Sequence, residues 1–150
     1  MVRMNILFVC TGNTCRSPMA EALLRHKGKG AFNVKSAGVF AADGQEASFQ
    51  TQEVLKENDI IHEHQSSLLN PKHIHWADYI FTMTERHKQN IAAIHPQAAD
   101  KMFTLKEFIT ESAVDRDVSD PFGRSVEVYR TTYKELDALI DRLIEKLKKS

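Results

Sequence analysis

Two cysteines and an arginine lie close together near the start of the chain, in the stretch VCTGNTCRSPMAE. Five residues separate Cys10 from Arg16, and the stretch continues directly from the apolar run Ile6–Val9. Side chains of these types at this spacing have four interpretations: a redox pair, a metal site, an ordinary strand-to-helix turn, or a loop that holds an anion against a thiol.

Neither a redox motif nor a metal site fits the spacing. The thioredoxin motif has two residues between its cysteines, whereas four lie between Cys10 and Cys15. A zinc site would need two or three further cysteine or histidine ligands, and a Walker loop would end in Gly-Lys-Ser/Thr. Solvated surface histidines are the more common case, so we expect no metal site. The histidine pairs that would have to supply such ligands are His62 with His64 and His73 with His75.

The anion-loop interpretation accounts for every residue of the stretch. A loop that curls after a strand and feeds a helix points backbone N–H groups inward, and with the helix N-terminus it forms an anion cradle. Arg16 would close the cradle with a planar fork suited to two phosphate oxygens. The same positive groups would stabilise the thiolate of Cys10. An ordinary turn would not require Gly12, Asn13 and Ser17 as well.

Composition is typical of one globular domain. The chain has 150 residues, 42% hydrophobic and 27% charged, with 20 basic and 20 acidic side chains. This length suits a single domain spanning 1–150, and the balanced charge argues against a nucleic-acid partner. We expect neither a leader peptide nor a membrane-spanning run, and hence a cytoplasmic protein, which we take to be a monomer. Two cysteines favour a reactive thiol over a disulfide framework.

Strand-like and helix-like patterns alternate along the chain. Ile6–Val9 is short, apolar and β-branched, as in a central strand buried on both faces. The alternation predicts an α/β fold, a small three-layer sandwich in which a central parallel sheet of about four strands has helices on both faces. Ligands bind such sheets beyond the carboxyl ends of the strands, which is where Cys10 lies.

The other elements follow from the same patterns. Further strands are predicted at Phe32–Ala37, Asp78–Met83 and Met102–Leu105. Helices are predicted from an N-cap at Ser17 to near Gly28, over Ala47–Asn58 with Phe49, Val54 and Leu55 available for packing, from Thr84 or Glu85 to about Ile94, and over Val126–Lys148. The last helix carries one apolar stripe of Tyr129, Tyr133, Leu136, Ile140, Leu143 and Leu147.

The stretch CTGNTCRSPMAE resembles the phosphate loop of the low-molecular-weight protein-tyrosine phosphatases, and its Cys-x5-Arg spacing is the signature of cysteine-dependent phosphatases. DPFG at Asp120–Gly123 resembles the Asp-Pro acid loop of that family, and SAG at Ser36–Gly38 and the block FTMTERHKQNI also fit it. The resemblance covers essentially the whole chain. It implies the low-molecular-weight phosphatase fold and an enzyme that acts on phosphorylated proteins without a metal or other cofactor.

The resemblance also implies a two-step mechanism through a phosphocysteine intermediate. Cys10 would attack phosphorus, Arg16 and the loop N–H groups would hold the equatorial oxygens, and Asp120 would act first as acid and then as base. Cys15 would either pack beneath the loop or protect an oxidised Cys10 as a reversible disulfide. The implied phosphate-binding residues are Thr11, Gly12, Asn13, Thr14, Cys15 and Ser17, and the implied network that shapes the loop comprises Asn13, Ser17, Ser36 and His64.

Departures from the tyrosine-specific pattern bear on the substrate. The chain has CTGNTCRS where that pattern has CLGNICRS, so Thr14 offers a smaller and more polar wall. The aromatic pair of the acid loop is reduced to Phe122 and Gly123. The chain resembles the bacterial protein-arginine phosphatases of the family in these features. We therefore expect a protein-arginine phosphatase that opposes a protein-arginine kinase in a Gram-positive-like stress response, with Phe40 either beside the substrate arginine or packed as a loop aromatic.

Three alternatives stay open. A low-molecular-weight protein-tyrosine phosphatase is the principal one. An arsenate reductase of this fold would need further cysteines, and none follows Cys15. A non-catalytic phosphate-binding module would need neither a nucleophile nor an acid, yet both Cys10 and Asp120 are present.

Overall fold

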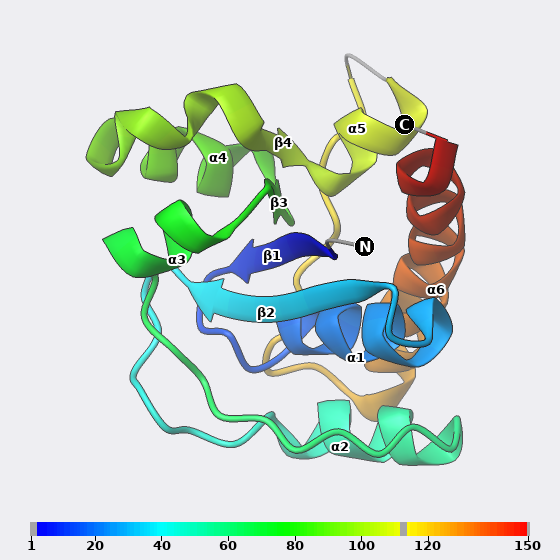
Figure 1. Cartoon of the computed structure of the whole chain (residues 1–150). Helices are drawn as coiled ribbons and strands as arrows, with labels where there is room; N and C mark the ends of the chain where they lie inside the picture. The colour runs from blue at the N-terminus through cyan, green and yellow to red at the C-terminus, as the bar shows by residue number, and fades with distance from the viewer. Residues whose placement is uncertain (1–2, 112–113, 150) are drawn as a thin grey trace.

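The computed structural model describes residues 3–111 and 114–149. Four parallel strands form one sheet in the order β2-β1-β3-β4 (Figure 1). This arrangement confirms the predicted parallel sheet and places the end of β1, where Cys10 lies, between its two neighbours. The strands are β1 (Met4–Cys10), β2 (Phe32–Gly38), β3 (Tyr79–Thr82) and β4 (Met102–Thr104).

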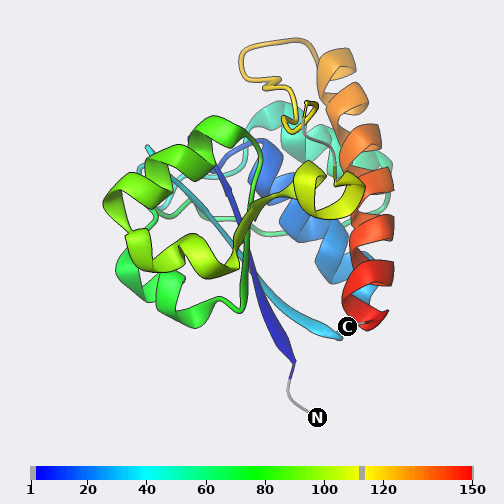
Figure 2. The ribbon, with the colours of Figure 1, turned by 90° about the horizontal axis from the view of Figure 1, so that it is seen from above.

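Helices cover both faces of the sheet, which Figure 2 shows edge-on. The three-layer sandwich predicted from the sequence is therefore confirmed. Within the described ranges, no helix is both long enough and apolar enough to cross a membrane. One face carries α1 (Arg16–Gly28), α2 (Phe49–Glu57), α5 (Leu105–Thr110) and α6 (Val126–Lys149). The other carries α3 (Pro71–Trp76), α4 (Glu85–Ile94) and the 3-10 helix Pro96–Lys101.

Strand β1 is buried on both faces, as its sequence predicts. Because successive side chains of a strand point to opposite faces, Ile6 and Phe8 pack in the cluster that includes α1 and α6. Leu7 and Val9 pack on the opposite face, in the cluster that includes α3 and α4. All four side chains are fully buried. The strand that ends at Cys10 is thus a rigid support.

Helix α6 presents its apolar stripe to the core. Tyr129, Tyr133, Leu136, Ile140, Leu143 and Leu147 are all buried, as predicted. The helix packs along α1, the helix that begins directly after the loop. Helix α6 therefore helps to hold α1 against the sheet.

Two local predictions are wrong. Ser17 does not cap α1, because the N-cap is Cys15 and the hydroxyl of Ser17 is engaged with the side chains of Cys10 and Asn13 instead. Phe49 does not pack in the core and is 69% exposed. It is the first residue of α2, directly after the N-cap Ser48, and the side chains this helix buries are further along it.

Candidate active site

The loop between β1 and α1 turns its carbonyl groups outward. Val39 N donates to Cys10 O, Phe40 N to Thr11 O and Ser48 N to Thr14 O, each at 3.0 Å. The C=O and N–H of one trans peptide point in opposite directions. The N–H groups that follow these carbonyls therefore face the interior of the loop, where they form the kind of cradle that binds an anion.

Strand β2 approaches this loop so closely that Gly38 has no room for a side chain. A Cβ at this position would lie 2.9 Å from Asn13 N and closer still to Thr11 O. Asn13 itself has a φ of 57°, in the left-handed region that asparagine tolerates better than most residues. Gly38, the glycine of the SAG sequence, is thus required beside the loop for steric reasons.

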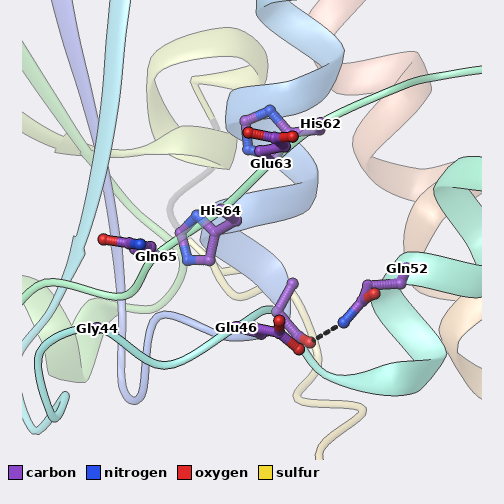
Figure 3. A pocket seen from close by; sticks show the side chains of 8 residues that line it. Gly44, Glu46, Gln52, His62, Glu63, His64 and Gln65 are labelled. Atoms are coloured by element: carbon purple, nitrogen blue, oxygen red, sulfur yellow. Dashed lines mark hydrogen bonds between the residues drawn. The ribbon is translucent and has the colours of Figure 1, made fainter.

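A pocket of about 300 Å³ opens above the loop. Phe40 and Phe122 stand at its rim and are 75% and 70% exposed. A larger hollow of about 690 Å³ lies elsewhere, beside residues 62–65 (Figure 3). The residues that line the smaller pocket are Cys10, Thr11, Gly12, Thr14, Cys15, Arg16, Phe40, Ala42, Gln45, Asp120 and Phe122. This pocket therefore gathers most of the predicted site residues and adds Ala42 and Gln45, which the sequence did not indicate.

The thiol of Cys10 is buried beside a hydroxyl group. Its Sγ lies 2.9 Å from Ser17 Oγ. Asn13 Nδ2 donates to the same Ser17 oxygen at 2.8 Å, so that oxygen already accepts a hydrogen bond. The hydroxyl proton of Ser17 is then free to point at the sulfur, where it would stabilise a thiolate.

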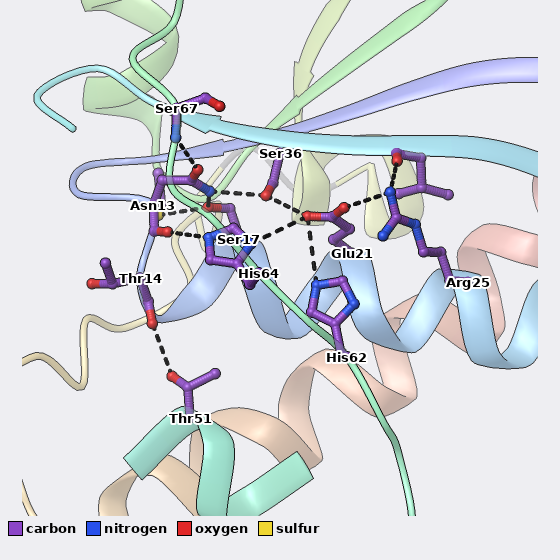
Figure 4. A network of polar contacts seen from close by, with 12 residues as sticks. Asn13, Thr14, Ser17, Glu21, Arg25, Ser36, Thr51, His62, His64 and Ser67 are labelled. Carbon is purple, nitrogen blue, oxygen red and sulfur yellow. Dashed lines mark hydrogen bonds and ion pairs between the residues drawn. The ribbon is translucent and has the colours of Figure 1, made fainter. Parts of the chain in front are cut away.

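Asn13 is held by a network that includes every predicted member (Figure 4). Its Nδ2 also donates to Ser36 Oγ at 2.9 Å, and Ser36 donates to Glu21 Oε1 at 2.6 Å. His64 Nε2 lies 2.6 Å from the backbone oxygen of Asn13. Ser67 N donates to Asn13 Oδ1 at 2.9 Å. The network thus extends past the predicted residues to Glu21 and Ser67.

Glu21 is a buried carboxylate that sequence reasoning missed as a site residue. It lies within the PMAE end of the motif, on α1. Burial raises the pKa of Glu21, but hydrogen bonds from His64 and Ser36 and the charge of Arg25 more than offset burial, so the pKa lies below its ordinary value. An acidic residue among the apolar residues of a helix is the signal that could have pointed to it.

Arg16 lines the pocket and faces Asp120. Its Nη1 donates to Val118 O at 2.9 Å, and its Nη2 lies 3.5 Å from Asp120 Oδ2. The Arg16 side chain is 4% exposed and that of Asp120 is 50% exposed. Among the described residues, Arg16 Nε has no hydrogen-bond partner. The site therefore holds a buried cation with a spare donor beside a carboxylate that water and substrate can reach.

His87 was not predicted as part of the site. It enters from α4, and its Nε2 lies 2.8 Å from Thr11 Oγ1. Burial, and to a smaller extent the charge of Arg16, lower the pKa of His87 to about 4, against smaller opposing effects of Asp120 and Asp117. His87 is thus neutral at physiological pH and adds no second positive charge to Arg16.

The lowered pKa of His87 predicts a pH-dependent loss of stability. As the pH falls below 6.5, His87 of the unfolded chain binds a proton, whereas His87 of the folded protein binds one only near pH 4. The free energy of unfolding should therefore fall between pH 6.5 and pH 4. The fall should be larger in the parent protein than in His87→Gln, by on the order of 2 kcal/mol. Urea unfolding at several pH values measures the difference. The contributions of the other buried histidines cancel in this difference, because both proteins contain them. If the free energy of unfolding depended on pH equally in the two proteins, the lowered pKa of His87 would be contradicted.

Cys15 lies under the loop and contacts α6. Its Sγ is 3.1 Å from the hydroxyl oxygen of Tyr129. Burial, together with the contact to Cys15, raises the pKa of Tyr129 to about 12, so the phenol stays protonated and can donate to the sulfur. Both cysteines are free thiols. The predicted role of Cys15 as a redox partner of Cys10 stays a prediction.

The fold and the Cys10 site together define a cysteine-dependent protein phosphatase. Residues 5–150 match the family model described as "Low molecular weight phosphotyrosine protein phosphatase". The chain belongs to this family.

Relatives within the family are similar over nearly their whole length. The chain is 56% identical to the protein-arginine-phosphatase of Geobacillus stearothermophilus over 142 residues, which are 95% of each protein. The solved structure of YwlE arginine phosphatase from Geobacillus stearothermophilus has a TM-score of 0.94 at 54% identity, with 97% of this chain and 94% of that chain covered. A mutant of YwlE arginine phosphatase with a phosphorylated active-site serine has a TM-score of 0.92 at 45% identity, with 98% and 97% covered.

Proposed function

We propose that the protein hydrolyses phosphoarginine on proteins. The observation that carries this proposal is the place of Thr14, whose polar side chain lines the Cys10 pocket together with Asp120. A phosphorylated guanidinium is planar and polar, so a hydroxyl wall suits it better than a branched apolar one. The name protein-arginine-phosphatase borne by the 56% identical relative supports the same substrate.

In the first step, Cys10 Sγ attacks phosphorus in line with the leaving guanidinium nitrogen. The S–P bond forms as the P–N bond breaks, and Asp120 gives its proton to that nitrogen. The loop N–H groups and Arg16 hold the three equatorial oxygens as charge moves onto them. The hydroxyl of Ser17, 2.9 Å from Sγ, stabilises the thiolate before the attack.

In the second step, water attacks the phosphocysteine. Asp120 now takes a proton from that water, the S–P bond breaks, and inorganic phosphate leaves. The first step leaves Asp120 as the carboxylate that this base role requires, and the proton taken from water restores the acid for the next turnover. The side chain of Asp120 is 50% exposed, so water can reach it. The solved mutant of a relative whose active-site serine is phosphorylated supports a covalent intermediate at this position of the loop.

The substrate side chain would lie between the two rim aromatics. Phe40 and Phe122 are both largely exposed at the pocket mouth. Aromatic rings in this position can pack on the methylene groups of an arginine or stack on its guanidinium plane. The exposed carboxylate of Asp120 would pair with the guanidinium as it leaves.

Thr14→Ile is expected to shift preference toward aryl phosphates. A branched apolar wall removes a hydroxyl and adds a surface for a flat ring, so the ratio of kcat/KM for phosphoarginine over phosphotyrosine should fall at least about tenfold. Thr14→Ser, which keeps the hydroxyl, is the matched control and should retain the ratio. Parallel loss of both activities in Thr14→Ile would mean that position 14 is structural.

The proposed activity is tested by incubating a phosphoarginine-containing protein with the enzyme. The expected products are unmodified arginine and inorganic phosphate in equal amounts, with phosphate first appearing on the enzyme. Failure to release phosphate from phosphoarginine while p-nitrophenyl phosphate is hydrolysed would overturn the arginine assignment.

A protein-tyrosine phosphatase is the second candidate. The observation in its favour is the pair of exposed rings at Phe40 and Phe122, which could also sandwich a phenol ring. For either substrate, we propose that Cys15 protects Cys10 after its oxidation to a sulfenic acid: the Cys15 sulfur attacks the Cys10 sulfur, the S–O bond breaks, and a disulfide and water form.

We also propose that the enzyme works in the cytoplasm, where free thiols such as Cys10 and Cys15 persist.

A further inference from the structure

Three side-chain atoms that could bind a metal ion lie close together between α1 and the segment that follows α2. Glu21 Oε1 lies 3.8 Å from His62 Nε2 and 3.7 Å from His64 Nδ1. All three atoms lie within 4.8 Å of one another (Figure 4). In tetrahedral zinc sites with bonds of about 2.1 Å, neighbouring ligand atoms are about 3.4 Å apart. The three donors are therefore close to the spacing that a metal ion would impose.

The contact between His64 and the loop fixes the tautomer of this histidine. Its Nε2 lies 2.6 Å from Asn13 O, a carbonyl oxygen that can only accept a hydrogen bond. The Nε2 atom must therefore carry a proton, and Nδ1 is the nitrogen that faces the Glu21 carboxylate. A bound metal ion would take the place of the proton on Nδ1 and be coordinated by its lone pair. A ring nitrogen bonded to a backbone carbonyl on the far side is the usual arrangement of a metal-ligating histidine.

His62 has no hydrogen-bond partner for Nε2, the atom that faces Glu21. The side chains of His62 and His64 are 5% and 4% exposed, so the expectation of solvated surface histidines is wrong for this pair. His62 Nε2 makes no hydrogen bond within the described parts of the chain. A buried polar atom without a partner costs free energy unless something satisfies it. A cation held between Glu21 and the two histidines would satisfy His62 and His64 at the same time.

One oxygen of the Glu21 carboxylate, Oε1, is available to bind a cation. Arg25 Nη2 binds Oε2 at 2.8 Å. The other oxygen, Oε1, accepts one hydrogen bond from Ser36, and a carboxylate oxygen has a second lone pair. The guanidinium therefore does not occupy the side of the carboxylate that faces the histidines.

The larger hollow offers an approach from solvent. It has a volume of about 690 Å³, and both histidines line it together with Glu46, Glu63 and Gln65 (Figure 3). Two acidic side chains at its wall would attract cations. Water in the hollow could supply the fourth ligand that a site with three protein ligands leaves open.

We propose that Glu21, His62 and His64 bind a divalent transition-metal ion of the zinc class. Two imidazoles and one carboxylate are donors that suit Zn²⁺, Co²⁺ and Ni²⁺. The bound ion would fasten the segment 59–70 to α1 and, through His64, would steady the Asn13 carbonyl of the phosphate loop. The site is separate from the Cys10 pocket and does not depend on which phosphorylated residue the enzyme accepts.

The proposal is tested by zinc titration of a chain in which Cys10 and Cys15 are both replaced by serine, so that no thiolate competes for the metal. Isothermal calorimetry should give one equivalent of Zn²⁺ per chain, and saturating Zn²⁺ should raise the melting temperature. Adding His62→Leu should weaken binding at least about tenfold and abolish the rise in melting temperature. The matched control is His75→Leu, at an exposed histidine of α3, which should change neither.

Melting without metal shows whether each variant is folded, and His62→Gln serves as a second variant if His62→Leu is not. Two results would overturn the proposal. One is the absence of any heat or melting shift with Zn²⁺ in the parent chain. The other is binding of undiminished affinity in a folded His62 variant, which would place the metal elsewhere.

Discussion

Replacing Cys10 with serine is expected to reduce kcat on a phosphoarginine peptide by at least about 10⁴-fold. A serine hydroxyl stays protonated at neutral pH and is a far weaker nucleophile than a thiolate. The loop N–H groups and Arg16 are unchanged, so the variant should still fold and bind inorganic phosphate. Steady-state phosphate release measures the loss.

The binding of inorganic phosphate by calorimetry is the control for that variant. If Cys10→Ser binds phosphate normally yet keeps more than about one hundredth of the parent activity, the nucleophile is another group and the assignment of Cys10 fails. If both binding and activity are lost, the melting curve distinguishes an unfolded chain from an altered loop.

Asp120→Asn is expected to lower kcat on phosphoarginine by about 10²- to 10⁴-fold, because the amide can neither give nor take the proton. The loss should be smaller on p-nitrophenyl phosphate, whose leaving group needs little protonation in the first step. Asp115→Asn is the matched control, since Asp115 lies in the same segment with a side chain 76% exposed and an ion pair to Lys106.

Equal activity losses in Asp115→Asn and Asp120→Asn would contradict the role of Asp120. The geometry argues otherwise, because Asp120 lines the Cys10 pocket and lies 3.5 Å from Arg16. Of these two acidic residues, only Asp120 lines that pocket.

The features set by local sequence were predictable. The apolar run Ile6–Val9 predicts a strand buried on both faces, and the periodic stripe on α6 predicts one buried helix face, because each pattern depends only on neighbouring residues. The loop was predictable for a similar reason. Its residues are contiguous, and the motif CTGNTCRS carries the family resemblance.

Contacts between distant segments were not predictable in this way. His87 meets Thr11 across 76 positions, and Tyr129 meets Cys15 across 114. Only the packing of α4 and α6 brings these groups to the loop. For Ser17, the local sequence predicted a helix cap that the structure does not contain. Its hydroxyl group contacts the sulfur of Cys10 instead.

The most direct test of the account compares kcat/KM for one peptide sequence carrying either phosphoarginine or phosphotyrosine at the same position. The polar wall at Thr14 and the carboxylate of Asp120 predict a preference for phosphoarginine of at least about tenfold. Thr14→Ile measured in parallel should narrow or reverse that preference. A clear preference of the parent enzyme for the phosphotyrosine peptide would contradict the proposed function.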